Sequence, residues 1–387
     1  MTPPQQSVFL TFDEAPVASG SIAQVHRARL HPAFVASRAV AGCPDVVAVK
    51  VRHPRVDTII TRDFAILRVV AELAGMLPGI RWMRLDESVR QFREPLFEQV
   101  DLSREAHNLR VFNHNFASWR RVSFPRPIEP LVTPAVLVES FEEGVSISTF
   151  MQGGDPQLRR SVADLGVKTL LKMMLADNWV HADLHPGNIL VRIDQPAKQN
   201  LLRRLLRPKP VPHIVLLDCG MTASLSDRNK ENLVNFFEVS AHDCLGASCP
   251  SVADARPCTQ RVLLLQQAIT RGDGRGVAET ALAFSERQTC PQPQEFVDDL
   301  VGLFSTAVAW GFEVNTSEWM SAVLESVRRH QVHLASEVCS VVVTALVLEG
   351  WSNRLDPDIC IMQQIRQVVF GSDRLKARLE DLAKLLT

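Results

Sequence analysis

Hydrophobic and polar residues alternate with a period of two in several short stretches near the start of the chain. This alternation predicts strands in VFLTF, QVHRARL and VVAVKV. The small-residue turn ASGSIA separates the first two, and a longer loop, HPAFVASRAVAGCPD, leads to the third. The N-terminal part of the chain is therefore expected to be rich in strands.

A helical period follows these strands. The segment RDFAILRVVAELAGML predicts a helix that stops at Pro78 and Gly79. Its apolar face is expected to hold Phe64, Leu67, Val70, Ala74 and Leu77. A second helix is expected to start near Asp86, to be interrupted or restarted at Pro95, and to continue through LFEQVDLSREAHNLRVF.

The pattern changes after the proline-rich link FPRPIEPLVTP and the short strand AVLVESF. The EEG that follows indicates a crossover between two lobes. LGVKTLLKMMLADNWV then predicts an amphipathic helix, strands are expected from Ile189 to Ile193 and in HIVLLD, and helices dominate from Ser226 onward. The chain is thus predicted to be α+β and bilobal, because 387 residues exceed what one hydrophobic core usually organises. The predicted N-lobe, 1–143, is small and β-rich with inserted helices, and the predicted C-lobe, 144–387, is mainly helical.

Composition narrows the possible functions. Hydrophobic residues make up 46% of the chain, and 42 basic residues balance 43 acidic ones, so no nucleic-acid partner is expected. Eight cysteines without a CxxC pair indicate neither a zinc knuckle nor a disulfide framework. The first residues lack a signal or transit pattern, and the longest nearly apolar run, 338–348, is too short to cross a bilayer.

The stretch HADLHPGNIL, residues 181–190, carries the most specific chemistry. Asp183 precedes Asn188 by five positions, the spacing of the protein-kinase loop HRDxxxxN, in which the aspartate receives a hydroxyl proton and the asparagine holds Mg²⁺. His181 occupies the histidine position, while alanine replaces the arginine. A zinc site made by His181, Asp183 and His185 is an alternative, but no further ligand cluster of suitable spacing accompanies it.

Three further motifs stand in kinase order. ASGSIAQV, residues 18–25, follows the glycine-rich loop GxGxxGxV with Gly20 in the middle position, although an ordinary hairpin turn would also explain it. Lys50 in VAVKV matches the kinase strand lysine, or it is a surface lysine, and Glu105 is its candidate partner or part of a solvated charged face. Asp218 in LLDCG corresponds to the aspartate of DFG.

Phosphoryl transfer explains why these residue types would occur together. Negative charge develops on the phosphate oxygens, so the enzyme needs Mg²⁺ on hard oxygen ligands, a cation on the phosphates and a carboxylate near the acceptor. Asn188 and Asp218 would supply the metal ligands, Lys50 the cation and Asp183 the carboxylate. The set predicts a protein-kinase-like fold that binds ATP or ADP with Mg²⁺.

Several spacings differ from those of ordinary protein kinases. Lys50 and Glu105 are 55 residues apart, and an inserted basic segment near 195–212 separates Asn188 from Asp218. No APE motif follows LLDCG, and the room for an activation segment is short. A peptide substrate is therefore disfavoured, and a small-molecule or lipid acceptor is expected instead.

These motifs together resemble the UbiB, or aarF-domain, family of atypical kinases. PVASGSIAQVHRA looks like its alanine-rich loop, VAVKVRHP its lysine strand, VDLSREAHN its helix C and HADLHPGNILV its catalytic loop, and the resemblance extends from about Phe12 to Gly220. It implies a magnesium-dependent phosphotransferase or ATPase in mitochondrial coenzyme Q and lipid metabolism, facing the matrix at the inner membrane. In this family Lys50 would pair with Glu105. The nucleotide would be covered by residues of the loop and its strand, namely Ala18, Ser19, Gly20, Ser21 and Val25.

Two departures from the family pattern bear on whether this chain is catalytically active. The family's ExD motif reads QVD here, with Gln99 in place of the glutamate and Asp101 kept, and no KxGQ helix precedes the alanine-rich loop. We therefore expect an N-terminally truncated chain without the targeting and membrane segments. A catalytically silent nucleotide-binding scaffold and an aminoglycoside- or choline-kinase-like phosphotransferase remain alternatives. Basic residues interleaved with leucines in 198–209 also suggest peripheral contact with an anionic membrane, or simply a basic loop.

Overall fold

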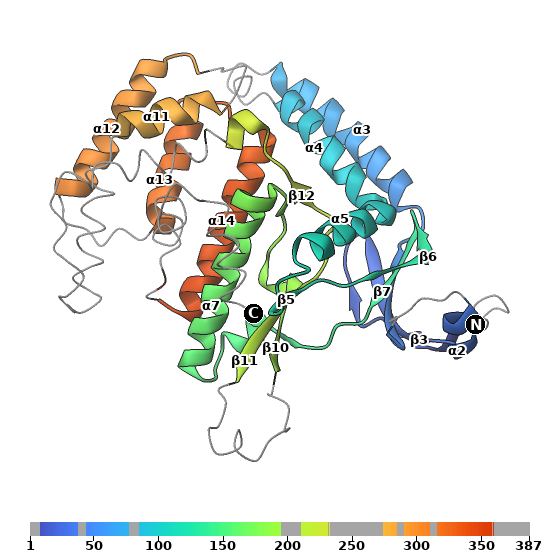
Figure 1. Cartoon of the computed structure of the whole chain (residues 1–387). Coiled ribbons are helices and arrows are strands. Elements are labelled where there is room, and N and C mark those ends of the chain that lie inside the picture. Colours follow the sequence, from blue (N-terminus) through green and yellow to red (C-terminus); the bar gives the residue numbers. More distant parts are fainter. Residues whose placement is uncertain are drawn as a thin grey trace, which may run out of the picture. The chain divides into compact units, whose positions relative to one another are not determined.

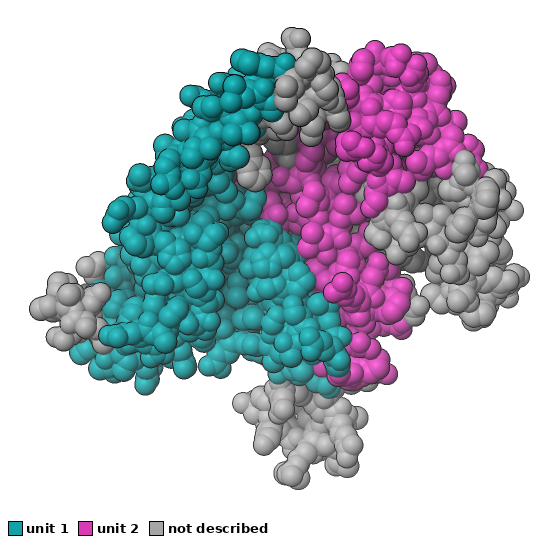
Figure 2. Space-filling model, turned by 180° about the vertical axis from the view of Figure 1, so that it is seen from behind, with its two compact units in different colours: residues 1–153, 183–222, 387 teal, residues 154–182, 223–386 magenta. Residues whose placement is uncertain are grey.

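The computed structural model describes residues 8–37, 44–76, 85–194, 210–230, 232, 274–284, 290–309, 316–357 and 359. The chain divides into two compact units, coloured teal and magenta in Figure 2. Unit 1 comprises residues 1–153, 183–222 and 387, and unit 2 comprises residues 154–182 and 223–386. The segment that contains Asp183, Asn188 and Asp218 therefore belongs to the same unit as Lys50 and Glu105. The lobe boundaries at 143 and 144 stay a prediction.

The larger sheet of unit 1 is antiparallel, with the order β1-β3-β4-β7-β6 and with β2 paired to β3 (Figure 1). Its strands are β1 Phe9–Phe12, β2 Ala18–Ser19, β3 Ala23–Leu30, β4 Val46–Arg52, β6 Pro127–Thr133 and β7 Val136–Ser140. The strands predicted from the alternating stretches are confirmed.

Successive side chains of β4 point alternately to the two faces of this sheet. Val47 and Val49 are buried in a core cluster with Ala28, Leu30, Ile128 and Val138. Because successive side chains in a strand point to opposite faces, Ala48 and Lys50 lie on the other face. One strand thus supplies both a core wall and a candidate functional lysine.

Strand β6 was missed, because the sequence was read there as a proline-rich link. The strand contains Pro127 and Pro130 and lies at the edge of the sheet. Proline cannot donate a ladder hydrogen bond, and an edge strand tolerates this loss because one of its sides has no neighbour. The two prolines are therefore incompatible with a strand in the interior of the sheet, but they are compatible with an edge strand such as β6.

A second, smaller sheet of unit 1 has the order β5-β11-β10-β8. Its strands are β5 Val122–Ser123, β8 Val145–Ser146, β10 Ile189–Asp194 and β11 Val211–Leu216. β10 and β11 pair antiparallel without a register shift, from Ile189 opposite Leu216 to Asp194 opposite Val211. Both strands were predicted, and residues 195–209 of the inserted basic segment lie outside the described residues.

Unit 1 also contains five described helices. They are α2 Pro32–Ser37, α3 Val56–Gly75, α4 Leu85–Val100, α5 Leu102–Asn115 and α6 Ile147–Phe150. The short helix α2 lies in the segment HPAFVASRAVAGCPD, for which the sequence predicted only a loop. Helix α3 was predicted, but the expected stop at Pro78 and Gly79 lies outside the described residues.

The apolar face predicted for α3 is largely wrong. Phe64 is buried as expected, but Leu67 and Val70 are 49% and 56% exposed, and Ala71 is buried instead. Apolar residues occur on most sides of this helix, so its sequence does not fix which side turns inward. Packing against α4 decides the orientation in the structure.

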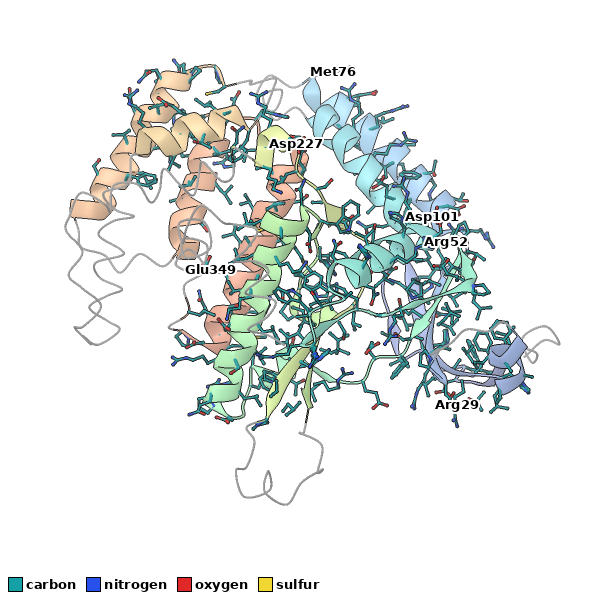
Figure 3. All side chains as sticks on the ribbon, in the orientation of Figure 1. Arg29, Arg52, Met76, Asp101, Asp227 and Glu349 are labelled. Atoms are coloured by element: carbon teal, nitrogen blue, oxygen red, sulfur yellow. The ribbon has the colours of Figure 1, made fainter. Side chains whose placement is uncertain are left out.

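The break between α4 and α5 was predicted at the wrong residue. Helix α4 continues through Pro95 and ends at Val100, whose carbonyl accepts a hydrogen bond from Arg52 Nη1 at 3.3 Å. Asp101 is the N-cap of α5, and its Oδ1 accepts from the amide of Ser103 at 2.9 Å. Figure 3 labels Arg52 and Asp101 at this junction. A favourable aspartate cap therefore begins α5 as a separate helix.

Helix α5 packs on β6 and β7 through a continuous apolar stripe (Figure 1). Leu102, Ala106, Leu109 and Phe112 are almost completely buried and recur at intervals of three and four residues, the spacing of one helix face. Glu105 is buried on this same helix with only 4% exposure. A carboxylate in such a position requires a charged or hydrogen-bonding partner.

Unit 2 is mainly helical. Its helices are α7 Pro156–Leu171, the π-helical segment η2 Lys172–Asp177, α11 Gly274–Ala283, α12 Pro293–Ala309, α13 Thr316–Arg329 and α14 Ser336–Leu355. Two short strands complete the described elements, β9 Val180–His181 and β12 Thr222–Ala223 at the border of the units. Helices α7, α13 and α14 were predicted, and most of the helix expected after Ser226 lies outside the described residues. The α+β class is confirmed.

Helix α14 packs against α7 in the interior of unit 2. Among the described helices, the 19-residue segment Glu337–Leu355 of α14 has the length and apolar character that a membrane crossing would need, with a mean hydropathy of 1.2 in its 18-residue apolar window. Of the apolar window in this segment, 44% is buried within the structure, and buried core helices share this composition. The sequence suggested no span because Glu349 ends the nearly apolar run.

Close packing between α7 and α14 generates a stability prediction. A Cβ atom at Gly166 would lie 2.3 Å from the Trp351 ring, and Trp351 is buried. We expect Gly166→Ala to lower the free energy of unfolding by about 1–3 kcal/mol, the usual cost of overpacking a core. Denaturant unfolding followed by tryptophan fluorescence measures this.

The control is Gly350→Ala, since a Cβ at this position of α14 would meet no atom within 4 Å. It should stabilise the protein by about 0.5–1 kcal/mol, because alanine has the higher helix propensity. Equal effects of the two substitutions would contradict the packing described here.

Candidate functional site

Lys50 lies in the middle of the larger sheet, on the face opposite the core cluster. In the strand register it stands between Val25 of β3 and Leu137 of β7. Its side chain is 14% exposed. Strands on both sides therefore fix the lysine in place and remove most of its solvent.

The Lys50 ammonium group contacts two carboxylates. Nζ donates to Glu105 Oε1 at 3.0 Å and Oε2 at 2.8 Å, and to Asp218 Oδ1 at 2.9 Å. Glu105 comes from α5, and Asp218 follows β11. Three of the residues singled out in the sequence, separated by up to 168 positions, thus meet at one nitrogen atom.

Electrostatics keep this lysine charged. Burial by itself would lower the pKa of Lys50, but the negative charges of Glu105 and then Asp218 raise it above its ordinary value. The ammonium form is therefore present throughout the physiological range. The site carries a permanent cation, as polyphosphate binding requires.

Glu139 is a member of this cluster that the sequence analysis missed. It lies on β7, on the face that carries Lys50, and is 9% exposed. Its Oε2 atom is buried without a hydrogen-bond partner within the described part of the chain. Burial, reinforced by the nearby charge of Glu105, raises the pKa of Glu139 well above its ordinary value. Glu139 lies two residues after Leu137, the partner of Lys50 on β7, and therefore on the same face of the sheet. The sequence alone does not reveal this, because it depends on the register between β4 and β7.

Asp218 and Cys219 occupy a constrained turn after β11. The backbone of Asp218 is left-handed, with φ of 53°, a conformation that aspartate adopts more readily than most residues. The Cys219 carbonyl accepts from Asn108 Nδ2 of α5 at 2.8 Å. Burial also raises the pKa of the Cys219 thiol well above its ordinary value. The thiol is therefore a packed, unreactive group, and Asn108 ties this turn to the helix that carries Glu105.

The catalytic-loop candidates are held by internal hydrogen bonds. Asn188 Nδ2 donates to the backbone oxygen of Asp183 at 3.0 Å and to its Oδ2 at 3.3 Å. His185 caps the short 3₁₀ turn Pro186–Asn188 by accepting from the Gly187 amide at 3.0 Å. A Cβ at 187 would lie 2.6 Å from the His185 ring, which explains the glycine in HPGN.

The two halves of the site share a backbone connection. The amide of Leu217 donates to the Asn188 carbonyl at 2.8 Å, and β10 and β11 pair immediately beyond it. Asn188 and Asp218 are therefore positioned by one strand pair despite the 30 residues between them. Asp183, whose side chain is 41% exposed, extends from the same loop.

The side-chain oxygen atoms of Asn188 and Asp218 are suitable ligands for a magnesium ion. Because the Asn188 amide nitrogen is engaged by Asp183, the arrangement leaves its oxygen as an acceptor, and Asp218 contributes a carboxylate. Mg²⁺ commonly binds through one or two protein oxygen ligands together with substrate phosphates. Within the described ranges, no group of three or more His, Cys, Asp or Glu side chains has the arrangement of a metal site, which speaks against the zinc alternative.

The alanine-rich loop approaches the site through backbone pairing. Ala18 of β2 stands opposite Val25, which in turn stands opposite Lys50. Gly20 closes the turn by donating to the Ala23 carbonyl at 2.9 Å, and its own carbonyl is 3.0 Å from His53 Nε2. His53 follows the lysine strand and was not singled out in the sequence, although it is part of VAVKVRHP.

The QVD segment has a structural role at Asp101, the N-cap of α5. Gln99 lies in the last turn of α4 and is partly exposed. Asp101 therefore precedes the helix, whereas Glu105 lies within it. The cap fixes the first turn of α5, which contains Glu105.

Comparison with known proteins finds similarity over most of the chain. A family model described as the ABC1 atypical kinase-like domain matches residues 1–243. The probable serine/threonine-protein kinase abkC of Dictyostelium discoideum is 29% identical over 92% of this chain and 54% of its own length. The mitochondrial ABC1 family protein YPL109C of Saccharomyces cerevisiae is 27% identical over 98% of this chain and 60% of its own length. The probable protein kinase UbiB of Vibrio campbellii is 29% identical over 60% of this chain and 40% of its own length.

The chain thus spans about two fifths to three fifths of the length of these relatives. Among solved structures, that of Rv3197 with erythromycin, from Mycobacterium tuberculosis, matches with a TM-score of 0.54. The match has 16% identity and covers 94% of this chain and 78% of that one, so it bears on the fold alone. The expected protein-kinase-like fold is confirmed.

The buried acid Glu139 generates a pH prediction. Its folded pKa lies above the unfolded value, so its stabilising contribution is complete below the ordinary glutamate pKa of about 4.3 and is lost as the pH rises toward the folded value. Glu139→Gln keeps the shape but cannot ionise. We expect this variant to gain stability relative to the wild type between pH 5 and pH 8 in denaturant unfolding.

The matched control is Glu143→Gln, which alters an exposed glutamate. Its stability difference from the wild type should stay nearly constant over the same pH range. A constant difference for Glu139→Gln as well would contradict a raised pKa at Glu139.

Proposed function

Because the chain belongs to the family of ABC1 atypical kinase-like domains, which includes the UbiB proteins, we propose that it binds ATP or ADP with magnesium and acts as an atypical kinase or ATPase. The observation that carries this proposal is the Lys50 ammonium group held between Glu105 and Asp218. A lysine on the surface is solvated by water and does not need two carboxylates around it. A lysine that must hold its charge in a fixed position for a polyphosphate needs such carboxylates.

Each residue of the site has a role in this proposal. Glu105 holds the Lys50 ammonium so that it can contact the phosphates next to the adenosine, as in protein kinases. Asp183 is the carboxylate near the acceptor, where it receives a hydroxyl proton or orients water, and Asn188 fixes its position. Asn188 and Asp218 would hold magnesium, which when bound supplies positive charge to the phosphate oxygens.

The short segment that follows Asp218 supports a proposal for the acceptor class. After Asp218-Cys219-Gly220 the chain forms the two-residue strand β12 and turns helical again at 227. This leaves little chain for the shelf on which protein kinases place a peptide. We therefore favour a small-molecule or lipid acceptor, or water, over a protein substrate.

Resemblance to the family also suggests a cellular setting. The yeast relative described above is named a mitochondrial protein. A mitochondrial location at the inner membrane, with a role in coenzyme Q and lipid metabolism, is the setting we propose. Peripheral membrane contact through 198–209 is part of this proposal, although those residues lie outside the described ones.

A catalytically silent scaffold is the second candidate. Gln99 in the ExD position favours it, because the family's glutamate is replaced there by a residue that cannot ionise. The aminoglycoside- or choline-kinase-like alternative is weaker, because the ABC1 family model matches residues 1–243. This range includes the alanine-rich loop and Asp218.

Nucleotide binding can be tested by thermal shift. At about 100 times Kd, Mg-ADP should raise the free energy of unfolding of the wild type by about 2.7 kcal/mol. Lys50→Ala should remove most of this effect, because the cation that contacts the phosphates is lost. Asp183→Asn should keep binding but abolish ATP turnover.

Lys168→Ala is the matched control, since Lys168 pairs with Asp164 on the surface of α7. It should bind Mg-ADP like the wild type. A wild type that binds but does not turn over ATP, with Asp183→Asn indistinguishable from it, would support the scaffold. No magnesium-dependent shift in the wild type would refute the proposal.

A further inference from the structure

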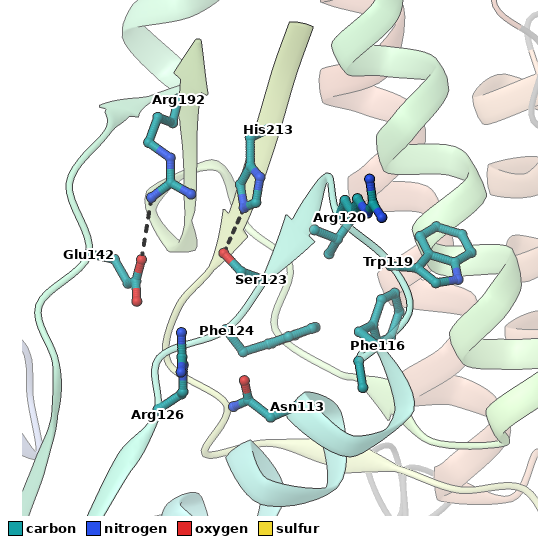
Figure 4. A pocket seen from close by; sticks show the side chains of 12 residues that line it. Asn113, Phe116, Trp119, Arg120, Ser123, Phe124, Arg126, Glu142, Arg192 and His213 are labelled. Carbon is teal, nitrogen blue, oxygen red and sulfur yellow. Dashed lines mark hydrogen bonds and ion pairs between the residues drawn. The ribbon is translucent and has the colours of Figure 1, made fainter. Parts of the chain in front are cut away.

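A pocket of about 550 Å³ lies in unit 1, lined by α5, β5, β10, β11 and the segments between them (Figure 4). This volume is in the range of small-molecule sites. Neither Lys50 nor Asp183 lines it, nor does any other residue assigned to the nucleotide. The pocket therefore needs an explanation of its own.

Its lining is positively charged. Arg120, Arg126 and Arg192 line the pocket against a single acidic residue, Glu142. Arg192 lies 3.7 Å from Glu142. Within the described part of the chain, the guanidinium groups of Arg120 and Arg126 have no hydrogen-bond or ion-pair partner. Two open guanidinium forks beside a concave surface favour an anionic ligand, since arginine binds carboxylate and phosphate groups with two parallel hydrogen bonds.

The charges are distributed over two sides of the pocket. Figure 4 shows Arg120 beside Trp119 on one side, and Arg126 on the other, toward Glu142 and Arg192. A ligand with one acidic group could use only one of these sides. A ligand with acidic groups at both ends could use both.

The floor between these arginines offers hydrogen bonds rather than a large apolar surface. Ser123 Oγ is 2.8 Å from His213 Nε2, and the rings of Phe116 and Phe124 that border the pocket are almost completely buried. Hydroxyl groups of a ligand suit such a floor better than an aromatic ring does. A polyhydroxylated phosphate ester meets both requirements.

The walls of the pocket are also the supports of the nucleotide site. Asn113 Nδ2 links α5 to the next segment by donating to the carbonyls of Leu109 at 2.8 Å and Pro125 at 2.9 Å. Phe112 of α5 stacks on Phe124 with ring centroids 4.8 Å apart. The same helix carries Glu105. The position of α5, and with it that of Glu105, therefore depends partly on the residues that line the pocket.

We propose that this pocket binds a small polyhydroxylated phosphate ester with more than one acidic group, and that its occupancy stabilises helix α5. The ligand bridges Arg120 and Arg126, and its hydroxyl groups contact the polar floor between them. Because α5 both lines the pocket and carries Glu105, the pocket is a regulatory site that acts on the candidate phosphotransferase centre through this helix. This inference goes beyond the proposed function and can be tested without nucleotide.

The experiment uses fructose 1,6-bisphosphate, fructose 6-phosphate and fructose as a series of probes in isothermal titration calorimetry. Binding should be saturable for the bisphosphate, weaker for the monophosphate and absent for the neutral sugar. Arg120→Gln and Arg126→Gln should each weaken bisphosphate binding at least about tenfold, because each removes a charged hydrogen-bond pair. Arg110→Gln is the matched control, because Arg110 lies on α5 but pairs with Glu129 outside the pocket.

Amide hydrogen exchange of residues 102–115, measured with and without the bisphosphate, tests the effect on α5. Exchange should slow in the wild type and stay unchanged in the double variant Arg120→Gln, Arg126→Gln. If binding is lost in the variants but exchange is unaffected in the wild type, the site is supported and its effect on α5 is refuted. No bisphosphate binding, or binding insensitive to both arginines, overturns the site.

The same chemistry occurs in lipid headgroups, so a vesicle measurement separates the two sources. Phosphatidylcholine vesicles with and without phosphatidylinositol 4,5-bisphosphate are tested for retention of the wild type and the double variant. Retention that requires both the bisphosphate lipid and the two arginines assigns a lipid headgroup. Binding of the soluble ester without vesicle retention assigns a free metabolite.

Discussion

The structure of unit 1 depends on a partly desolvated ammonium group that must be neutralised. Lys50 has lost most of its water on the face of the sheet opposite the core cluster, and a charge in that position is tolerated only with close counter-charges. Glu105 and Asp218 provide them from a helix and from the end of a distant strand. The requirement thus holds the first sheet, α5 and the β10–β11 pair in one arrangement, and the Asn108 bond to Cys219 reinforces it.

The cluster contains more acid than base. Three carboxyl groups, those of Glu105, Asp218 and Glu139, influence the charge of one lysine. Such an imbalance is costly in a closed protein interior, and it can be relieved by a proton on a buried acid or by an added cation. Glu139 meets the first condition, since burial favours its neutral form. Asp218, half exposed and at the end of β11, is placed to meet the second when a divalent ion arrives.

Much of this arrangement was predictable from the sequence, for identifiable reasons. Lys50, Asp183, Asn188 and Asp218 stand in short motifs whose spacing within the chain reflects the chemistry itself. Glu105 could be proposed only as a candidate, because its pairing across 55 residues depends on how α5 is oriented. Glu139 was missed because its role arises from strand register, which local patterns do not encode. The exposed face of α3 and the start of α5 at Leu102 were mispredicted, since packing on α4 and the side-chain cap at Asp101 decided them.

The regular pairing of β10 with β11 has a consequence for how this chain could vary. The last pair, Asp194 opposite Val211, brings the two ends of the intervening segment to adjacent points at the far end of the ladder from Asn188 and Asp218. Doubling the length of a flexible loop costs only about 0.6 kcal/mol in closure entropy. Insertions or deletions between Asp194 and Val211 should therefore cost the folded protein little stability, because the paired strands already hold both ends of the segment together.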